Sequence, residues 1–231
     1  MKENDAIKAV LTGDIVGSSR LSTQERRALH GQFNQSAARL EKAFAGQILH
    51  TPEIVRGDSW QFAIADPREA LRMALFFRAL IRITLPDADI DTRIAIGFGT
   101  VDFLPGENLS SGDGQAYRLS GEGLEELQKT FRMGVFFPAE ARSDLTEALD
   151  VIVKLIDREA GKWTQAQAES FAGALLGLTQ QEIASDWVAR DITQQAVAQH
   201  LERAGWSTIE IGLDFFEHTL PGALSKPGER G

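Results

Sequence analysis

The stretch that most constrains the fold runs from Ile54 to Ile64, where two runs of strand-forming residues flank a Gly-Asp pair. In the second run, Trp60, Phe62 and Ile64 alternate with smaller or polar residues, which is the period of a half-buried strand. Two such runs joined by a tight turn that contains glycine predict a β-hairpin. The hairpin would place Asp58 at its tip, where the carboxylate is free to bind a ligand.

A second segment, Ala9 to Ser19, has the same character, because an apolar run leads straight into Asp14 and then into small residues. If the two strands are neighbours in one sheet, Asp14 and Asp58 lie close together. Carboxylates bind hard divalent cations, and such cations neutralise phosphate groups. The pair therefore suggests a divalent cation and a phosphate-bearing ligand. Each aspartate also follows a glycine, so each is equally compatible with an ordinary turn.

The absence of cysteine from the 231 residues excludes disulfides, thiolate metal sites and cysteine nucleophiles. The formal net charge of −9 disfavours general, charge-driven binding to nucleic acid. The four histidines show no metal-ligand spacing. The amino terminus lacks the apolar core of a signal peptide, and no apolar run is long enough to span a membrane. We therefore expect a cytoplasmic protein with no membrane partner.

Periodicity and capping signals predict a regular order of elements before and after the hairpin. We expect strands at 7–15, 91–101 and 133–137, and helices at 22–45, 67–84 and 115–129. The first helix begins at a capping box and has an apolar stripe of Leu29, Phe33, Ala37, Leu40 and Phe44. The first six elements follow the order βαββαβ, which is typical of a ferredoxin-like domain.

The character of the chain changes around 149–163, and the remainder is rich in Ala, Gln and Leu. We expect helices at 165–176, 179–189 and 194–204, of which the last two form a helix-turn-helix. Periodicity predicts that Ile183, Val197 and Leu201 pack inward, while the glutamines of the last helix point outward. We therefore predict an α/β (α+β) fold with a ferredoxin-like domain at 1–148, a small all-α domain at 149–220 and a disordered tail at 221–231.

Three segments resemble, in order and spacing, the motifs of class III nucleotidyl cyclases. Residues 13–21 resemble the first metal-binding segment, 56–60 the second metal-binding hairpin, and 112–120 the segment whose arginine stabilises the transition state. The resemblance covers roughly residues 5 to 140 and implies a nucleotidyl cyclase-type domain. It implies that Asp14 and Asp58 hold Mg²⁺ or Mn²⁺, and that Arg118 faces the phosphates across a homodimer interface.

The nucleotide would lie against the glycines and serines of the two metal-binding segments, namely Gly17, Ser18, Ser19 and Gly57. The first three are equally an amide nest for phosphate or a flexible connection. Two positions depart from the adenylyl cyclase pattern. Ile54 stands where those enzymes carry a base-reading lysine, and Gly114 stands where they carry an asparagine. We therefore expect that the protein is not a working adenylyl cyclase.

The helix-turn-helix resembles region four of bacterial sigma factors, and its union with a degenerate cyclase-like domain resembles the SatD family. This resemblance implies that the second helix contacts DNA through Thr193, Gln194, Gln195 and Gln199. Glutamine can form paired hydrogen bonds with adenine in the major groove. From Leu155 onward, however, the chain carries six Lys and Arg against eleven Asp and Glu, so few cations can contact phosphates.

These observations favour a cytoplasmic regulatory protein in which a nucleotide or metal at Asp14 and Asp58 controls a DNA- or partner-binding helix-turn-helix. One alternative is an active nucleotidyl cyclase with unusual base selection. The other is a non-enzymatic protein whose helix-turn-helix serves interaction or assembly.

Overall fold

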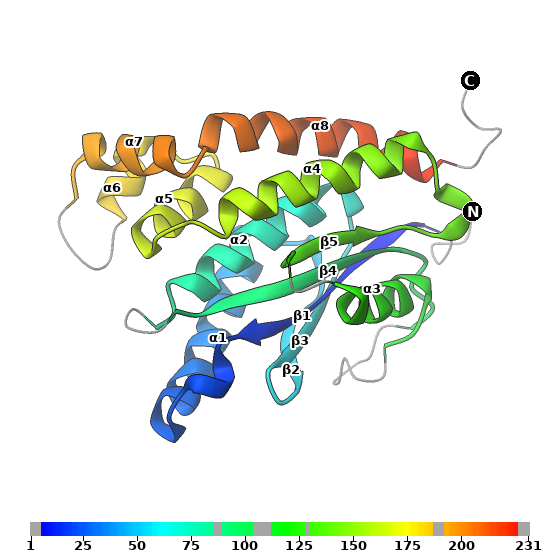
Figure 1. The fold of residues 1–231 in the computed structure, drawn as a ribbon, viewed down its shortest axis with the longest axis horizontal. Coiled ribbons are helices and arrows are strands. Elements are labelled where there is room, and N and C mark those ends of the chain that lie inside the picture. Colours follow the sequence, from blue (N-terminus) through cyan, green and yellow to red (C-terminus); the bar gives the residue numbers. More distant parts are fainter. Residues whose placement is uncertain (1–5, 86–88, 104–111, 128–129, 187–191, 226–231) are drawn as a thin grey trace.

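The computed structural model describes residues 6–85, 89–103, 112–127, 130–186 and 192–225. Figure 1 shows a mixed sheet with helices on both faces, so the predicted combination of α and β structure is confirmed. The strands are β1 (Lys8–Val16), β2 (Ile48–Arg56), β3 (Ser59–Ile64), β4 (Asp91–Gly99) and β5 (Met133–Phe136). The helices are α1 (Thr23–Ala43), α2 (Ala70–Arg82), α3 (Gln115–Glu126), α4 (Asp144–Ala160), α5 (Gln165–Leu175), α6 (Gln180–Ser185), α7 (Gln194–Arg203) and α8 (Trp206–Leu224).

The five strands form one sheet in the order β2-β3-β1-β4-β5. The central strand β1 is antiparallel to both β3 and β4, whereas β5 is parallel to β4. The predicted hairpin is confirmed, because β2 and β3 pair across a two-residue turn in which Gly57 has a φ of 65°. In this register Asp14 lies opposite Ser59 on one side and Arg93 on the other.

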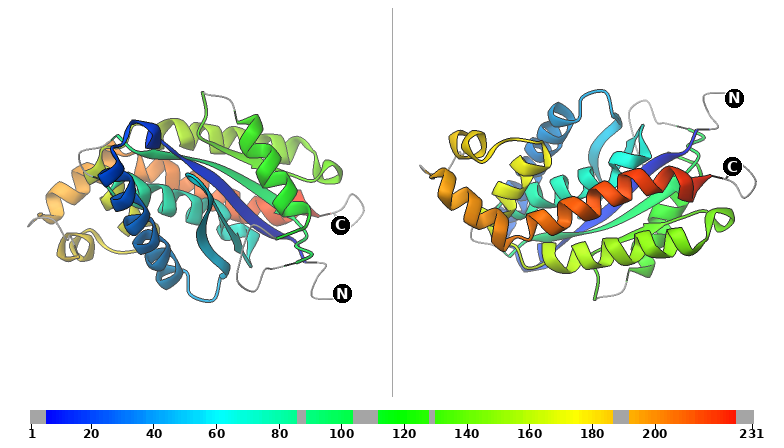
Figure 2. Two further views of the ribbon diagram at one scale, coloured as in Figure 1. Left: turned by 90° about the horizontal axis from the view of Figure 1, so that it is seen from below. Right: turned by 90° about the horizontal axis from the view of Figure 1, so that it is seen from above.

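The helices form two unequal coverings of the sheet (Figures 1 and 2). Helix α3 lies alone on one face, and the remaining long helices cover the other. The predicted stripe of α1 is buried from Leu29 to Leu40, and the Phe33 ring contacts the Phe77 ring of α2 edge-on. Helix α2 is buried on nearly all sides because it lies between the sheet and the helices that follow β5. The outer surface of this thicker side is formed by α4 and α8.

A buried cluster of charges joins α2 to β4 and α4. Arg78 donates two hydrogen bonds of 2.9 Å to the Asp91 carboxylate and one of 2.6 Å to Asp157 Oδ1. Arg82 and Arg132 also bind Asp91, and the Arg132 backbone N–H donates to Asp157 Oδ2. Burial by itself would raise the pKa of Asp91, but the three arginines outweigh it and lower the pKa to about 2. The cluster therefore stays charged at neutral pH.

The chain after β5 is helical, as predicted, and shares its core with the sheet. The main buried cluster contains sheet residues such as Phe98 together with Leu149, Phe171 and Phe216. The division of the chain at residue 148 stays a prediction, but the buried core continues across it. The Arg78–Asp157 ion pair crosses it as well.

Helices α5, α6 and α7 form a second apolar cluster centred on Ile183, Val197 and Leu201. The predicted inward packing of these three residues is confirmed. Helix α6 ends at Ser185, earlier than expected, and the predicted continuation falls partly on residues 187–191, which lie outside the described residues.

The long final helix was not predicted. It begins directly after Gly205, whose φ of 77° ends α7, and it continues through Pro221 to Leu224. The first part of the tail predicted to be disordered is therefore helical, and residues 226–231 lie outside the described residues. Within the part of the chain that the structure describes, no helix is both long and apolar enough to cross a bilayer.

Candidate functional site

The candidate site lies where β1, β3 and β4 meet near the hairpin, and Asp14 is its centre. The Asp14 side chain is 20% exposed and that of Arg93 is 33% exposed. Arg93 Nε donates to Asp14 Oδ1 at 2.9 Å, and a second guanidinium nitrogen donates to Oδ2. This two-point contact is the strong geometry for an arginine–carboxylate pair. The hydrogen bond with Asp14, assisted by the charges of Asp14 and Asp58, raises the pKa of Arg93.

Asp58 occupies the hairpin turn next to this pair. Its backbone carbonyl accepts a hydrogen bond of 3.1 Å from the Ile15 N–H, which ties the turn to the end of β1. Its carboxylate accepts a bond of 2.5 Å from the Ser18 hydroxyl. Asp14 on β1 and the turn that carries Asp58 are therefore neighbours, and the distance between the two carboxylates stays a prediction.

The aspartates do not form a preassembled centre for two cations. Asp14 already holds a guanidinium, and one oxygen of Asp58 already accepts from Ser18. Within the described ranges, no group of three or more histidines and carboxylates is arranged to hold a metal ion. Hard cations in proteins are held by several oxygen ligands, so these residues fit the predicted Mg²⁺ or Mn²⁺ pair poorly.

The residues predicted to bind nucleotide lie around the same turn. Gly17 has a φ of 93°, and a Cβ there would come within 2.9 Å of the Asp89 carbonyl oxygen, so the position favours glycine. Ser18 and Ser19 follow in a short 3₁₀ turn, and Gly57 precedes Asp58 in the hairpin. The structure thus gathers these residues beside Asp58, and their role in binding stays a prediction.

The third predicted site residue, Arg118, lies on α3, the helix that covers one face of the sheet. It is exposed on α3 and pairs with Asp113 at 3.1 Å. Two residues farther along α3, the Ser120 hydroxyl lies 2.7 Å from the hydroxyl of Thr12, which is two residues before Asp14 on β1. Helix α3 therefore crosses the sheet near the aspartates, and the role of Arg118 toward the phosphates stays a prediction.

The two departures from the cyclase pattern have structural reasons. Ile54 is partly buried and packs against the main core, so its side chain contributes to packing. Gly114 has a φ of 137°, and a Cβ there would lie 2.6 Å from the Thr100 carbonyl oxygen. An asparagine at position 114 would require the backbone to move.

Arg93 is the residue that sequence reasoning missed. The alternation of the 91–101 strand places it on the same face as Ala95 and Gly97, so an arginine among the small and apolar residues of 93–99 was a visible signal. Its partner could not be known, because the pairing of β1 with β4 joins residues 79 positions apart.

Helices α6 and α7 were predicted to form a helix-turn-helix, and the predicted DNA-contacting residues of α7 lie on its polar side. Thr193, Gln194, Gln195 and Gln199 are all exposed, as predicted for the glutamines. Thr193 also caps α7, since its hydroxyl accepts from the Ala196 N–H. Helices α6 and α7 carry two carboxylates, Glu182 and Glu202, and Arg203 at the end of α7 is the one arginine or lysine within these two helices.

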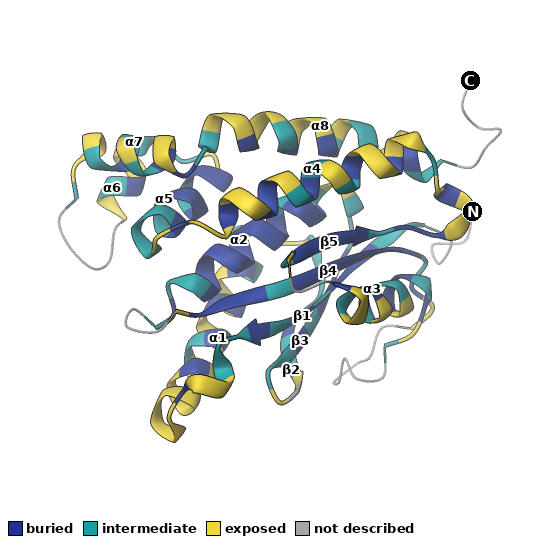
Figure 3. Cartoon of the chain, viewed as in Figure 1, coloured by how far each residue is buried: buried dark blue, intermediate teal, exposed yellow. Residues whose placement is uncertain are grey.

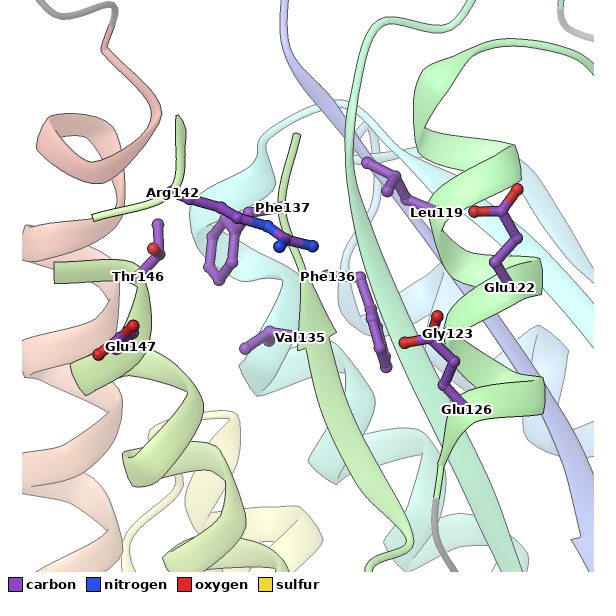
Figure 4. A pocket seen from close by; sticks show the side chains of 10 residues that line it. All are labelled: Leu119, Glu122, Gly123, Glu126, Val135, Phe136, Phe137, Arg142, Thr146 and Glu147. Carbon is purple, nitrogen blue, oxygen red and sulfur yellow. The ribbon is translucent and has the colours of Figure 1, made fainter. Parts of the chain in front are cut away.

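A cavity of about 310 Å³ lies on the opposite edge of the sheet, between α3, β5 and the start of α4 (Figure 4). Glu122 and Glu126 of α3, Phe136 of β5 and Arg142 line it. None of the residues predicted to bind metal or nucleotide lines this cavity.

Two solved structures of bacterial light-regulated adenylyl cyclases are similar to part of the chain. One is 16% identical and the other 12% identical, and each match has a TM-score of 0.38. Each match covers 56% of this chain and 42% of the other chain, so the likeness spans less than half of those proteins. Comparison with known protein families and with curated proteins gives no match.

Proposed function

We propose that this protein is a non-enzymatic regulatory protein. Its ferredoxin-like, cyclase-type half has no cyclase activity, and its helix-turn-helix binds the regulated target. The observation that carries the proposal is the two-point pair between Arg93 and Asp14. The arginine supplies at Asp14 the positive charge that a catalytic cation would supply in a working cyclase. The order β2-β3-β1-β4 with α1 and α2 on one face supports the ferredoxin-like assignment.

Three further features oppose turnover by one chain. Ile54 packs against the core, and Gly114 has no room for an asparagine. Arg118 pairs with Asp113 within the same chain and not with a group of the candidate site. An active cyclase with unusual base selection would have to overcome all three.

A nucleotide remains the ligand class that Gly17, Ser18, Ser19 and Gly57 favour, because they surround the turn next to Asp58. The binding would be weak. Among the described residues, Arg93 balances one of the two negative charges of Asp14 and Asp58, and the remaining charge opposes a free triphosphate. Arg26, which donates to the Ser19 carbonyl oxygen at 3.3 Å, offsets part of this repulsion.

Helix α7 has an exposed polar face and a buried apolar face, and this arrangement supports binding of the polar face to DNA. The low number of cations on α6 and α7 predicts that one chain binds non-specific DNA weakly, and that its affinity depends only slightly on salt concentration. Two copies would be needed to contact two half-sites. A protein target for the same face is the competing output.

The test of the loss of turnover uses the full chain with Mn²⁺ and each of the four nucleoside triphosphates. We expect no cyclic product above the level given by Asp58→Ala. Turnover that disappears in Asp58→Ala would overturn the proposal in favour of an active cyclase. Fluorescence anisotropy with random-sequence DNA across a range of salt concentrations tests the output separately.

A further inference from the structure

The outer surface of α4 and α8 carries an apolar patch that no part of the described chain covers. Val151 and Leu155 of α4 are 55% and 61% exposed, and Ile211 and Phe215 of α8 are 71% and 45% exposed. We call these four residues the α4–α8 patch. Figure 3 shows exposed residues along the outer faces of both helices.

The four side chains form one surface because the helices pack closely. A Cβ on Gly212 would lie 3.1 Å from the Ile156 side chain and 3.5 Å from that of Ile152, so the glycine lets α8 approach α4. Each exposed pair has a spacing of four residues, which places both members on one side of its helix. Soluble monomers rarely expose contiguous apolar patches larger than a few hundred Å².

The two helices run in opposite directions, side by side, in Figures 1 and 2. Gly212 is level with the turn from Ile152 to Ile156, so Ile211 is level with Leu155. Counting about 1.5 Å per residue from there, Phe215 and Val151 are also level, one turn farther along. The patch therefore has two levels, each with one side chain from each helix.

This pattern is self-complementary. A two-fold rotation about an axis parallel to the helices places α4 of one copy on α8 of the other. Each level of the patch then faces the same level of the other copy. Leu155 would contact Ile211 of the partner subunit, and Val151 would contact Phe215 of the partner subunit.

The charges beyond the patch match in the same arrangement. Exposed Arg158 lies one turn beyond Leu155 on α4, at the end where α8 carries exposed Glu210. Exposed Glu147 lies at the other end, where α8 carries His218. Arg158 would therefore meet the opposite charge of Glu210, and Glu147 would meet His218.

From these observations we infer that the α4–α8 patch binds a second copy of this chain, with α4 of each copy on α8 of the other. The outer faces of helices with 17 and 19 residues are about 25 Å long. Two such faces side by side, each about 10 Å wide, cover about 500 Å² in projection, which is of the same order as the roughly 800 Å² of accessible surface that each partner buries in a standard interface. The inference does not rest on the proposed function.

The arrangement has a consequence for the helix-turn-helix. Helices α6 and α7 lie at one end of α4 and α8 in Figure 1. A two-fold axis parallel to α4 and α8 keeps both copies of α7 at that same end. The pairing would therefore present two α7 helices side by side, which is what a two-fold symmetric target requires.

The test is the mass in solution, measured by light scattering from low to high micromolar concentration. We expect a dimer for the natural chain and a monomer for Leu155→Glu and for Ile211→Glu. Because both side chains are mostly exposed, the thermal midpoint of the monomer should change little. Val55→Glu is the matched control, since Val55 is an exposed apolar residue on β2, outside the patch, and this variant should stay dimeric.

Cross-linking tests the geometry, because the chain has no cysteine of its own. A chain with Leu155→Cys is mixed with a tagged chain with Ile211→Cys and oxidised. We expect a disulfide between the two different chains. A monomeric natural chain, a dimer that survives Leu155→Glu, or no cross-link between the mixed chains would each overturn the inference.

Discussion

The first residues of β4 contribute to two aspartate–arginine clusters, and these clusters differ chiefly in burial. Asp91 is buried and binds three arginines, whereas Asp14 binds Arg93 at a partly exposed position beside the hairpin. Thr92 links the two, because its N–H donates to Asp91 and its hydroxyl lies 2.7 Å from the Asp14 carbonyl oxygen. Burial makes the first cluster a structural joint between the sheet and α4. Exposure leaves the second open to competition from solvent ions.

The same residue types therefore have different consequences in the two places. Removing one partner from a buried ion pair leaves an uncompensated charge out of water, at a cost of about 3–5 kcal/mol. A partly exposed pair is weakened by solvent, so its removal lowers the free energy of unfolding by about 1 kcal/mol or less. The first prediction measures this contrast directly.

Asp91→Ala should lower the free energy of unfolding by about 3–5 kcal/mol, because Arg78 would lose its main partner in the interior. Asp14→Ala is the matched variant on the other cluster and should cost about 1 kcal/mol or less. Urea denaturation followed by circular dichroism measures both. Equal losses for the two variants would show that burial does not distinguish the clusters.

Gly114→Asn should lower stability by about 3 kcal/mol, because the new side chain meets the Thr100 carbonyl oxygen in a strained backbone conformation. It should also fail to create cyclase turnover. Gly121→Asn in the same helix is the control, since a Cβ at Gly121 meets no atom within 4 Å. If Gly114→Asn is as stable as the control and gains turnover, the structural reason given for this departure is wrong.

Acid should destabilise the protein through Asp91. Because its pKa is lowered from 3.8 to about 2 in the folded chain, the ion pairs stabilise the fold fully above about pH 4. That contribution, about 2 kcal/mol, is lost as the pH falls from 4 toward 2. Unfolding measured across this range should show a steeper loss for the natural chain than for Asp91→Asn. Parallel curves would contradict the assignment.

Local signals in the sequence predicted much of the fold. The Gly57-Asp58 turn, the capping box at Ser22 and the buried stripe of α1 are all present, because each depends on neighbours within a few residues. Helix α8 was missed for the same reason: Gly205 marks a helix end, and Pro221 is usually found outside helices. Only packing against α4 and the sheet shows that the chain resumes its helix.

The candidate site was predicted in part. Strand alternation and the glycines before each aspartate predicted that Asp14 and Asp58 lie at neighbouring places in one sheet, and β1 does pair with β3. The partners that decide their chemistry, Arg93 for Asp14 and Ser18 for Asp58, come from strand pairing and a loop contact. The buried cluster was missed because Arg78 sits in an apolar helix and its partner Asp157 is 79 residues away.

The central claim is that Arg93 takes the charge role of a cation at Asp14, and the most direct test is Mn²⁺ binding by calorimetry. We expect the natural chain to bind Mn²⁺ only weakly, with a Kd near or above about 1 mM. Arg93→Gln should bind at least about tenfold more tightly, a gain of about 1.4 kcal/mol, because Asp14 is released. Adding Asp14→Asn to that variant should remove the gain. Tight binding of two Mn²⁺ ions by the natural chain, unchanged in Arg93→Gln, would contradict the account.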